Sequence, residues 1–262
     1  MHNKYRMCSP QNIPPLTGSC DSFLGPEKTE ELYNAYLSES RQSGAREWLR
    51  PDLLPFTVHD IYRRWLPRGV KILFIAESPP WIGVQTAADL LRPEYVYFYN
   101  ADYDPRRGPR GKTTLGSTVF RHLGVEGASR YEQLIRFREA GLFLTDTIKC
   151  IFFKNRKPAI PSSLIQFSAR TILEQEIATI GPDYICAMGN TALSALRCMD
   201  RFRPFLESEN AITGVTRKEP LIEDVRLILM PFPNQRNRGR KCSRERMDAG
   251  FETVKELLGR DG

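Results

Sequence analysis

The sequence predicts a three-layer α/β/α sandwich built around a mostly parallel, four-stranded sheet. Two observations support this fold class. Short apolar runs rich in β-branched and aromatic residues occur at 70–76, 141–146, 183–189 and 225–231, as expected of strands that are buried on both faces. Segments with the apolar spacing of amphipathic helices separate these runs. Strands that alternate with helices favour a parallel sheet with helices on both faces.

The first two helices are expected upstream of the sheet, over 25–40 and 57–65, with Pro26 placed to start the first one. We expect residues 1–66 to form an N-terminal arm and helices that pack on the core, and residues 67–262 to form the α/β domain. The other expected helices cover 113–124, 131–141, 162–181, 190–199 and 244–259.

Composition restricts the class of protein. The 262 residues are 41% hydrophobic and 26% charged, and 38 Lys and Arg face 31 Asp and Glu, for a net charge of +7. No run approaches the roughly 20 apolar residues of a membrane span, and the N-terminus has no apolar signal core. We therefore expect a soluble, basic, monomeric protein of the cytoplasm (nucleoid-associated) or nucleus, neither secreted nor attached to a membrane.

Cysteine and histidine usage argues against a metal site. The six cysteines are scattered without a CxxC pair, and none of the three histidines has the spacing of metal ligands. We expect reduced thiols, no metal and no cofactor.

Basic residues concentrate in three segments, 104–112, 149–157 and 233–246, which follow predicted strands. The carboxyl ends of parallel strands meet at one edge of a sheet, where ligands bind. Clustered cations favour a polymer of phosphates through counterion release, and arginine suits bidentate phosphate contact. The alternative is a generally solvated basic surface. The DNA-binding candidates are Arg106, Arg107, Arg110, Lys149, Lys154, Arg156, Arg236, Arg238 and Arg240.

Aromatic residues accompany these basic segments, and one group lies shortly before the first of them. Tyr97, Phe98 and Tyr99 are candidates for base stacking, which is worth roughly 1–3 kcal/mol per base. The alternative is packing in the core.

Four motifs in order resemble the uracil-DNA glycosylase superfamily. AESPP (76–80) is similar to its GEAPG-type first motif, and LTDTIKC (144–150) to a segment of its iron–sulfur branch. AMGNTAL (187–193) resembles a turn of that branch, and LILMPFPN (227–234) falls where the superfamily carries its HPS motif. The resemblance covers 70–234, looks closest to a divergent side branch, and implies the superfamily's α/β fold and excision of a base from DNA.

The same motifs depart from the family at functional positions. Asp146 replaces the Asn that reads the pyrimidine edge, and Phe232 stands where the His that stabilises the leaving base is expected. Cys150 matches a cluster ligand, but the next cysteine is replaced by Ala169 and no N-terminal CxxC exists. We therefore expect no iron–sulfur cluster.

Base excision places positive charge on the sugar and negative charge on the leaving base. A carboxylate that stabilises the cation or activates water is therefore needed, with a donor facing the base. Glu77 is the candidate carboxylate, unless it only caps the following turn. Ser78 is expected to orient the water or bind a phosphate. Asn234, Arg236 or Asn237 would stabilise the leaving base.

Asp146 bears on the identity of the base. An Asn side chain offers one donor and one acceptor, whereas an ionised Asp offers only acceptors. Either the target is not ordinary uracil, or burial holds Asp146 protonated. The structural alternative is that Asp146 caps the amides of 147–149.

Three hypotheses follow. The first is a DNA base-excision enzyme that hydrolyses the N-glycosidic bond of a damaged or deaminated base. The second is a catalytically inactive nucleic-acid-binding protein of the same fold. The third is an enzyme acting on a small phosphorylated ligand, although no P-loop and no GxGxxG after a strand occurs.

Overall fold

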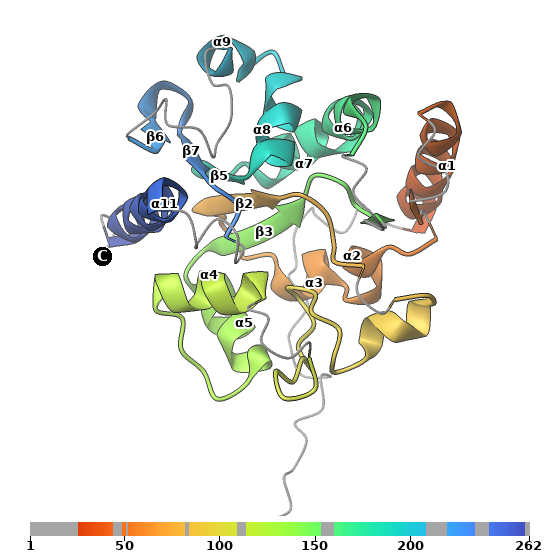
Figure 1. Cartoon of the computed structure of the whole chain (residues 1–262), viewed down its shortest axis with the longest axis horizontal. Helices are drawn as coiled ribbons and strands as arrows, with labels where there is room; N and C mark the ends of the chain where they lie inside the picture. The colour runs from red at the N-terminus through yellow and green to blue at the C-terminus, as the bar shows by residue number, and fades with distance from the viewer. Residues whose placement is uncertain are drawn as a thin grey trace, which may run out of the picture.

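The core of the protein is a five-stranded sheet with strand order β3-β2-β5-β7-β6 (Figure 1). Four strands are parallel and fully or almost fully buried: β2 (Ile72–Ala76), β3 (Leu142–Asp146), β5 (Tyr184–Met188) and β7 (Leu227–Met230). These are the four strands that the apolar runs predict. The fifth, β6 (Leu221–Ile222), pairs antiparallel with β7 at the edge, and its two residues are too few to give a pattern. The computed structural model describes residues 26–43, 49–50, 52–81, 84–108, 114–152, 160–207, 219–233 and 241–259.

Helices cover both faces of the sheet, as Figure 1 shows. On one face lie α4 (Leu115–Leu123), α5 (Arg130–Glu139) and α11 (Lys241–Gly259). On the other lie α6 (Ser162–Ser168), α7 (Glu174–Ile180) and α8 (Asn190–Arg197), with a π-helical segment (Ala169–Leu173) joining α6 to α7. The predicted three-layer sandwich is confirmed. Short elements without a sequence pattern complete this part of the chain: η4 (Ala87–Leu91), α9 (Arg203–Leu206) and η6 (Glu223–Val225).

The helix expected over 57–65 is two helices. α2 (Pro55–Val58) and α3 (Ile61–Trp65) are separated at Asp60, whose φ of 48° lies in the left-handed region. Aspartate tolerates this conformation better than most residues, so the change of direction occurs there.

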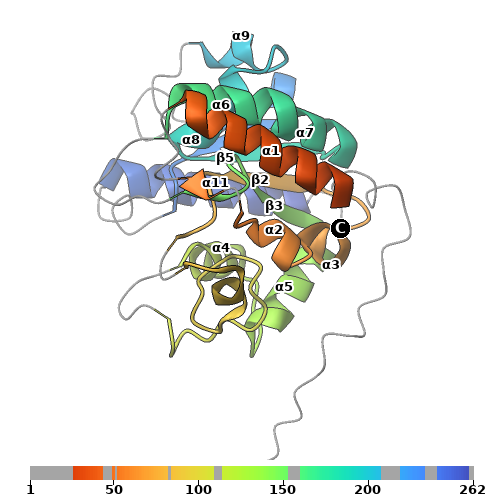
Figure 2. The ribbon, with the colours of Figure 1, turned by 90° about the vertical axis from the view of Figure 1, so that its right-hand side faces the viewer.

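The N-terminal helix α1 (Pro26–Gln42) lies alongside α6 (Figure 2). The hydroxyl of Tyr36 is hydrogen-bonded to Ser168 Oγ at 2.7 Å and accepts the backbone N–H of Lys149 at 3.1 Å. α1 therefore supports the segment that follows β3. A second, two-stranded ribbon pairs β1 (Leu49–Arg50) with β4 (Ile151–Phe152). Among the described helices, none is both long and apolar enough to cross a membrane.

Candidate active site

The candidate site lies where the strand order reverses. The chain crosses from β2 to β3 on one side and then from β3 to β5 on the other side of β2. The carboxyl ends of β2 and β5 are thus the topological switch point, where open α/β sheets bind ligands. Glu77 directly follows β2 and Thr191 is the second residue of α8, after β5. Thr191 Oγ1 donates a hydrogen bond to Glu77 Oε2 at 2.7 Å.

The segments after β2 and β3 are joined by backbone hydrogen bonds. Thr147 donates to the carbonyl of Ala76 from its N–H at 2.9 Å and from its hydroxyl at 2.7 Å, and Ile148 N–H donates to the carbonyl of Glu77 at 3.0 Å. Asp146 is the register partner of Ala76. Both carboxyl-bearing residues therefore come from a rigid pair of neighbouring strands.

Asp146 is only 6% exposed. Burial raises the pKa of its carboxyl to about 7, while nearby Lys149 lowers it and Glu176 raises it. Near neutral pH much of Asp146 is therefore protonated, with one donor and one acceptor as in an amide. The capping alternative is not supported, because the amides of 147, 148 and 149 donate to Ala76, Glu77 and Tyr36 respectively.

Lys149 was expected to contact phosphates, but the structure places its side chain in the interior at 1% exposure. Its ammonium is paired with Glu176 Oε2 and bound to the hydroxyl of Thr145. Oε1 of Glu176 accepts hydrogen bonds from Tyr62 and Thr145, both at 2.7 Å. Lys149 is therefore part of a buried, hydrogen-bonded charge network behind Asp146 and is not available to DNA.

The expected stacking residues are buried too. Phe98 packs on Phe120 and Phe137 at ring separations of 5.1 and 5.2 Å. The hydroxyl of Tyr99 donates to the carbonyl of Leu144 at 3.0 Å and accepts its N–H at 2.8 Å. For these two aromatic residues the core-packing alternative holds.

Tyr97 is buried as well, but it lies close to Asp146, whose charge adds to burial in raising the pKa of its hydroxyl. Its ring is 5.2 Å from that of His59 and 6.1 Å from that of Tyr95. Tyr95 in turn donates to the carbonyl of Pro80 at 2.8 Å. An aromatic layer therefore supports the turn that follows Glu77.

His59 was not singled out by the sequence, where it is an isolated histidine. Its Nε2 is buried and finds no hydrogen-bond partner among the described residues. Burial lowers the pKa of its imidazole to about 4, so the ring is neutral at pH 7. Thr191 and Glu176 were also missed, although Thr191 lies in the AMGNTAL turn that carries the family resemblance.

The remaining expected residues fall into three groups. Ser78 is half-buried beside Glu77, and Arg106 and Arg107 are exposed, with Arg106 paired to Asp104 at 3.0 Å. Phe232 is half-buried and a Cβ at Gly189, whose φ is 87°, would lie 2.9 Å from the Cβ of Phe232. The other candidates lie outside the described residues: Arg110, Lys154, Arg156, Asn234, Arg236, Arg238 and Arg240.

The residues present do not fit the iron–sulfur cluster of the resembling branch. Cys150 is completely buried, and burial raises the pKa of its thiol, which disfavours the thiolate that a cluster needs. Ala169, at the next ligand position, is buried without a coordinating atom. Within the described ranges, no group of three or more His, Cys, Asp or Glu side chains is arranged to hold a metal ion.

Fold and site together define an α/β protein with a carboxylate held at the switch point of its sheet. The family model of the uracil DNA glycosylase superfamily matches residues 66–255. The chain belongs to this superfamily, which confirms the resemblance and the fold class predicted from the motifs. Membership supports a glycosylase-like role in DNA repair, with DNA as the partner. No curated protein matches the chain.

Proposed function

We propose that this protein is a DNA N-glycosylase that hydrolyses the bond between a deaminated base and its sugar. The observation that carries the proposal is the placement of Glu77. Its carboxylate accepts a hydrogen bond from Thr191 at 2.7 Å at the switch point. Glu77 follows β2, and the neighbouring strand β3 ends in Asp146. This arrangement supports a role for one carboxyl group at the sugar and for the second at the base.

The proposed reaction uses water as the nucleophile. The target nucleotide is extruded from the stack, and the C1′–N bond breaks with both electrons leaving on the base. The carboxylate of Glu77 stabilises the cationic sugar or accepts a proton from the water that adds to C1′. The departing base takes up the proton, so that the products are a free base and an abasic sugar.

Asp146 is proposed to select the base. A protonated carboxyl offers O–H to a carbonyl oxygen and C=O to a ring N–H. Uracil, hypoxanthine and xanthine each present such a carbonyl beside a ring N–H, whereas cytosine and adenine present an amino group there. The raised pKa of Asp146, about 7, supports a base that has a carbonyl beside a ring N–H over cytosine and adenine. Thymine and guanine share this edge, so Asp146 is proposed to select uracil and hypoxanthine against their parent bases, cytosine and adenine.

The test is a glycosylase assay on oligonucleotides that carry a single uracil, hypoxanthine, xanthine or modified cytosine, in single- and double-stranded form. We expect the wild type to release a deaminated base and Glu77→Gln to lose at least 10²-fold in rate, as for loss of a positioned acid or base. Glu77→Gln keeps the size and the hydrogen bond from Thr191. Equal rates in both proteins would overturn the role of Glu77.

A second candidate function is DNA binding without catalysis. It is favoured by Phe232, which stands at the position of the family's histidine and has no donor. Under this reading no base is released, while binding to DNA remains strong, depends steeply on salt and is unchanged in Glu77→Gln.

A further inference from the structure

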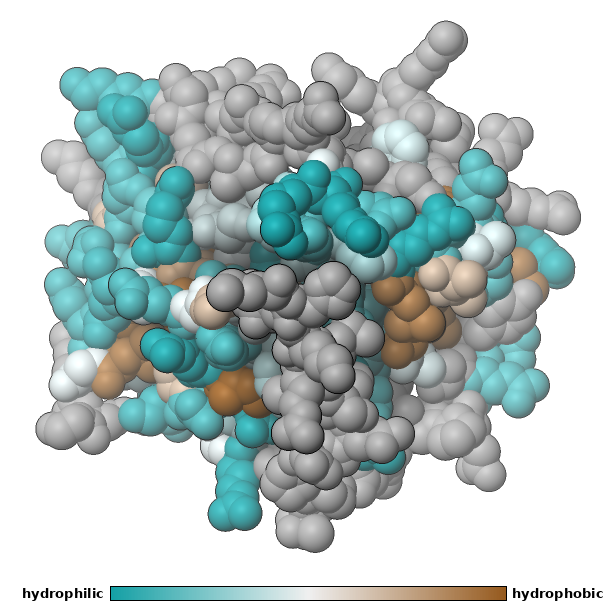
Figure 3. Space-filling model, turned by 90° about the horizontal axis from the view of Figure 1, so that it is seen from below, coloured by the Kyte–Doolittle hydropathy of each residue, from teal (hydrophilic) through white to brown (hydrophobic). Residues whose placement is uncertain are grey.

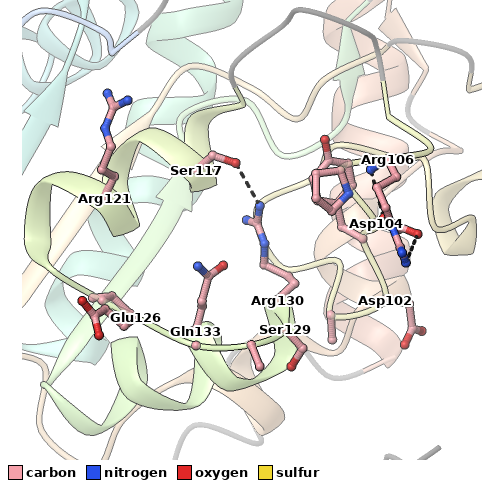
Figure 4. Close-up of a pocket in the computed structure, with 15 residues that line it drawn as sticks. Asp102, Asp104, Arg106, Ser117, Arg121, Glu126, Ser129, Arg130 and Gln133 are labelled. Atoms are coloured by element: carbon pink, nitrogen blue, oxygen red, sulfur yellow. Dashed lines mark hydrogen bonds and ion pairs between the residues drawn. The ribbon is translucent and has the colours of Figure 1, made fainter. Parts of the chain in front are cut away.

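A pocket of about 870 Å³ lies apart from the strand ends that carry Glu77 and Asp146. Three segments form it: the turn over 101–106, helix α4, and the loop over 125–129 that leads into α5 (Figure 4). The end of the molecule that α4 and α5 form carries mainly hydrophilic side chains, with smaller hydrophobic patches between them (Figure 3). No step of the proposed reaction uses this pocket.

Arg130 forms the floor of the pocket. It is the first residue of α5 and is only 7% exposed. Its guanidinium carbon lies 5.1 Å from the ring centre of Tyr103 and 5.0 Å from that of Phe120. Gly116 is needed beside it, because a Cβ at this position would lie 1.9 Å from Nη1 of Arg130. The guanidinium is thus held in one place by two aromatic rings and by helix α4, which approaches it closely because Gly116 has no side chain.

This cation has no anionic partner among the residues that the structure describes. Within the described part of the chain, its one side-chain hydrogen-bond partner is Ser117 Oγ at 3.5 Å, which is at the limit of a hydrogen bond. Burial lowers the pKa of Arg130 to about 10, so it remains charged at pH 7. Retaining a buried charge without an anionic partner is costly, and the guanidinium has five N–H donors in a fixed plane, more than the contact with Ser117 uses.

The carboxylates around the pocket are directed elsewhere. Asp104 is paired with Arg106 at 3.0 Å, and in Figure 4 the side chains of Asp102 and Glu126 point away from the guanidinium of Arg130. Arg121, one turn along α4 from Ser117, adds a second cation to the lining. Arg130 and Arg121 therefore both line the pocket, and the carboxylates around it are turned away from Arg130 or paired with another residue.

We propose that this pocket binds a phosphate group, with Arg130 donating to two of its oxygens. Planar, bidentate recognition of a phosphate is the task for which guanidinium is best suited. The phosphate comes either from a DNA strand, outside the nucleotide that is excised, or from a free phosphate or nucleotide. Only the first source rests on the proposed function.

The first experiment measures the thermal unfolding temperature of the full chain in sodium phosphate and in sodium chloride of equal ionic strength and pH. A ligand of the folded state raises this temperature with its concentration. We expect the rise in the wild type and in Arg136→Met, whose arginine is exposed on the same helix, and no rise in Arg130→Met. Ser117→Asp places a carboxylate beside the guanidinium, so it should unfold at a higher temperature in chloride and also lose the response to phosphate.

The second experiment measures DNA affinity at several salt concentrations for the same four proteins. If DNA supplies the phosphate, Arg130→Met and Ser117→Asp bind more weakly, and the slope of log affinity against log salt falls by about 0.9 for one lost duplex contact. A response to inorganic phosphate with unchanged DNA affinity assigns the pocket to a free phosphate. If neither phosphate response nor DNA affinity depends on Arg130 or Ser117, the proposal is wrong, whatever the outcome of the excision assay.

Discussion

The hydroxyl of Thr191 donates a hydrogen bond to Oε2 of Glu77 at 2.7 Å, which joins the residue after β2 to the first turn of α8. The two residues are 114 positions apart in the chain, and the parallel pairing of β2 with β5 brings them together. Gly189, whose φ is 87°, makes the turn from β5 into α8. The orientation of the proposed catalytic carboxylate therefore depends on a side chain from a different βα unit.

Removing this hydrogen bond should reduce the rate of base release. Thr191→Val keeps the shape of the side chain but leaves Glu77 without this donor, and we expect kcat to fall by about 10²-fold with KM little changed, since misplacement of a reacting group costs rate of this order. Thr191→Ser, which keeps the hydroxyl, is the control and should stay close to the wild type. Single-turnover release of base from an oligonucleotide measures both, and equal losses in Val and Ser would argue against the hydrogen bond.

The buried carboxyl of Asp146 should make stability depend on pH. Its pKa in the folded protein is about 7, above the value of about 3.9 in an unfolded chain. The stability that the protonated carboxyl of Asp146 contributes to the folded state is therefore fully present below pH 4 and is lost as the pH rises through 7. Relative to Asp146→Asn, the free energy of unfolding of the wild type should fall by up to about 4 kcal/mol between pH 4 and pH 8. Urea denaturation of both proteins at each pH measures this difference, and parallel curves would contradict it.

The same ionisation should control excision. Above its pKa of about 7, Asp146 loses the O–H that faces a base carbonyl, so kcat/KM on a uracil substrate should fall about tenfold for each pH unit. Asp146→Asn keeps one donor and one acceptor at every pH and should show no such decrease. A decrease that is the same in both proteins would assign the titration to another group.

Much of the architecture could be predicted because its strands are buried on both faces. Four runs of apolar residues marked β2, β3, β5 and β7; Glu77 directly follows the first run, and Asp146 is the last residue of the second. Residues that end buried strands can be found in this way without knowing what they contact. The edge strand β6, with two residues, carries too little pattern to be found.

The partners of these residues could not be predicted, since they come from distant parts of the chain. Glu176 had no local feature that sets it apart, and Thr191 was marked only by its place in the AMGNTAL turn. Lys149 was taken for a surface cation because its neighbours up to 157 include several others, yet its side chain turns inward to Glu176. Phe98 and Tyr99 lie shortly before the first basic segment in the sequence, but a strand-like run of aromatic residues is equally compatible with a core.

The buried pair of Lys149 and Glu176 gives a prediction about stability. Lys149→Met leaves the Glu176 carboxylate buried without its cation and should cost about 3–5 kcal/mol, whereas replacing both residues by apolar ones should cost less. Arg107→Met, at an exposed position, should stay within about 0.5 kcal/mol of the wild type. The double-mutant cycle is measured by urea denaturation. Normal stability with weakened DNA binding in Lys149→Met would restore the surface role that the sequence indicated.

Phe232 limits the rate if the proposed function is correct. It follows β7 at the position of the family's histidine and packs close to Gly189, but an aromatic hydrocarbon cannot stabilise the negative charge of a leaving base. Phe232→His supplies a donor there, and we expect base release to rise by 10²–10³-fold, the amount that one such donor is worth. Phe232→Leu changes the side chain without adding a donor and should show no gain. Single-turnover assays on the best substrate compare the three proteins, and an equal rate in His and Leu would mean that another residue already stabilises the leaving base.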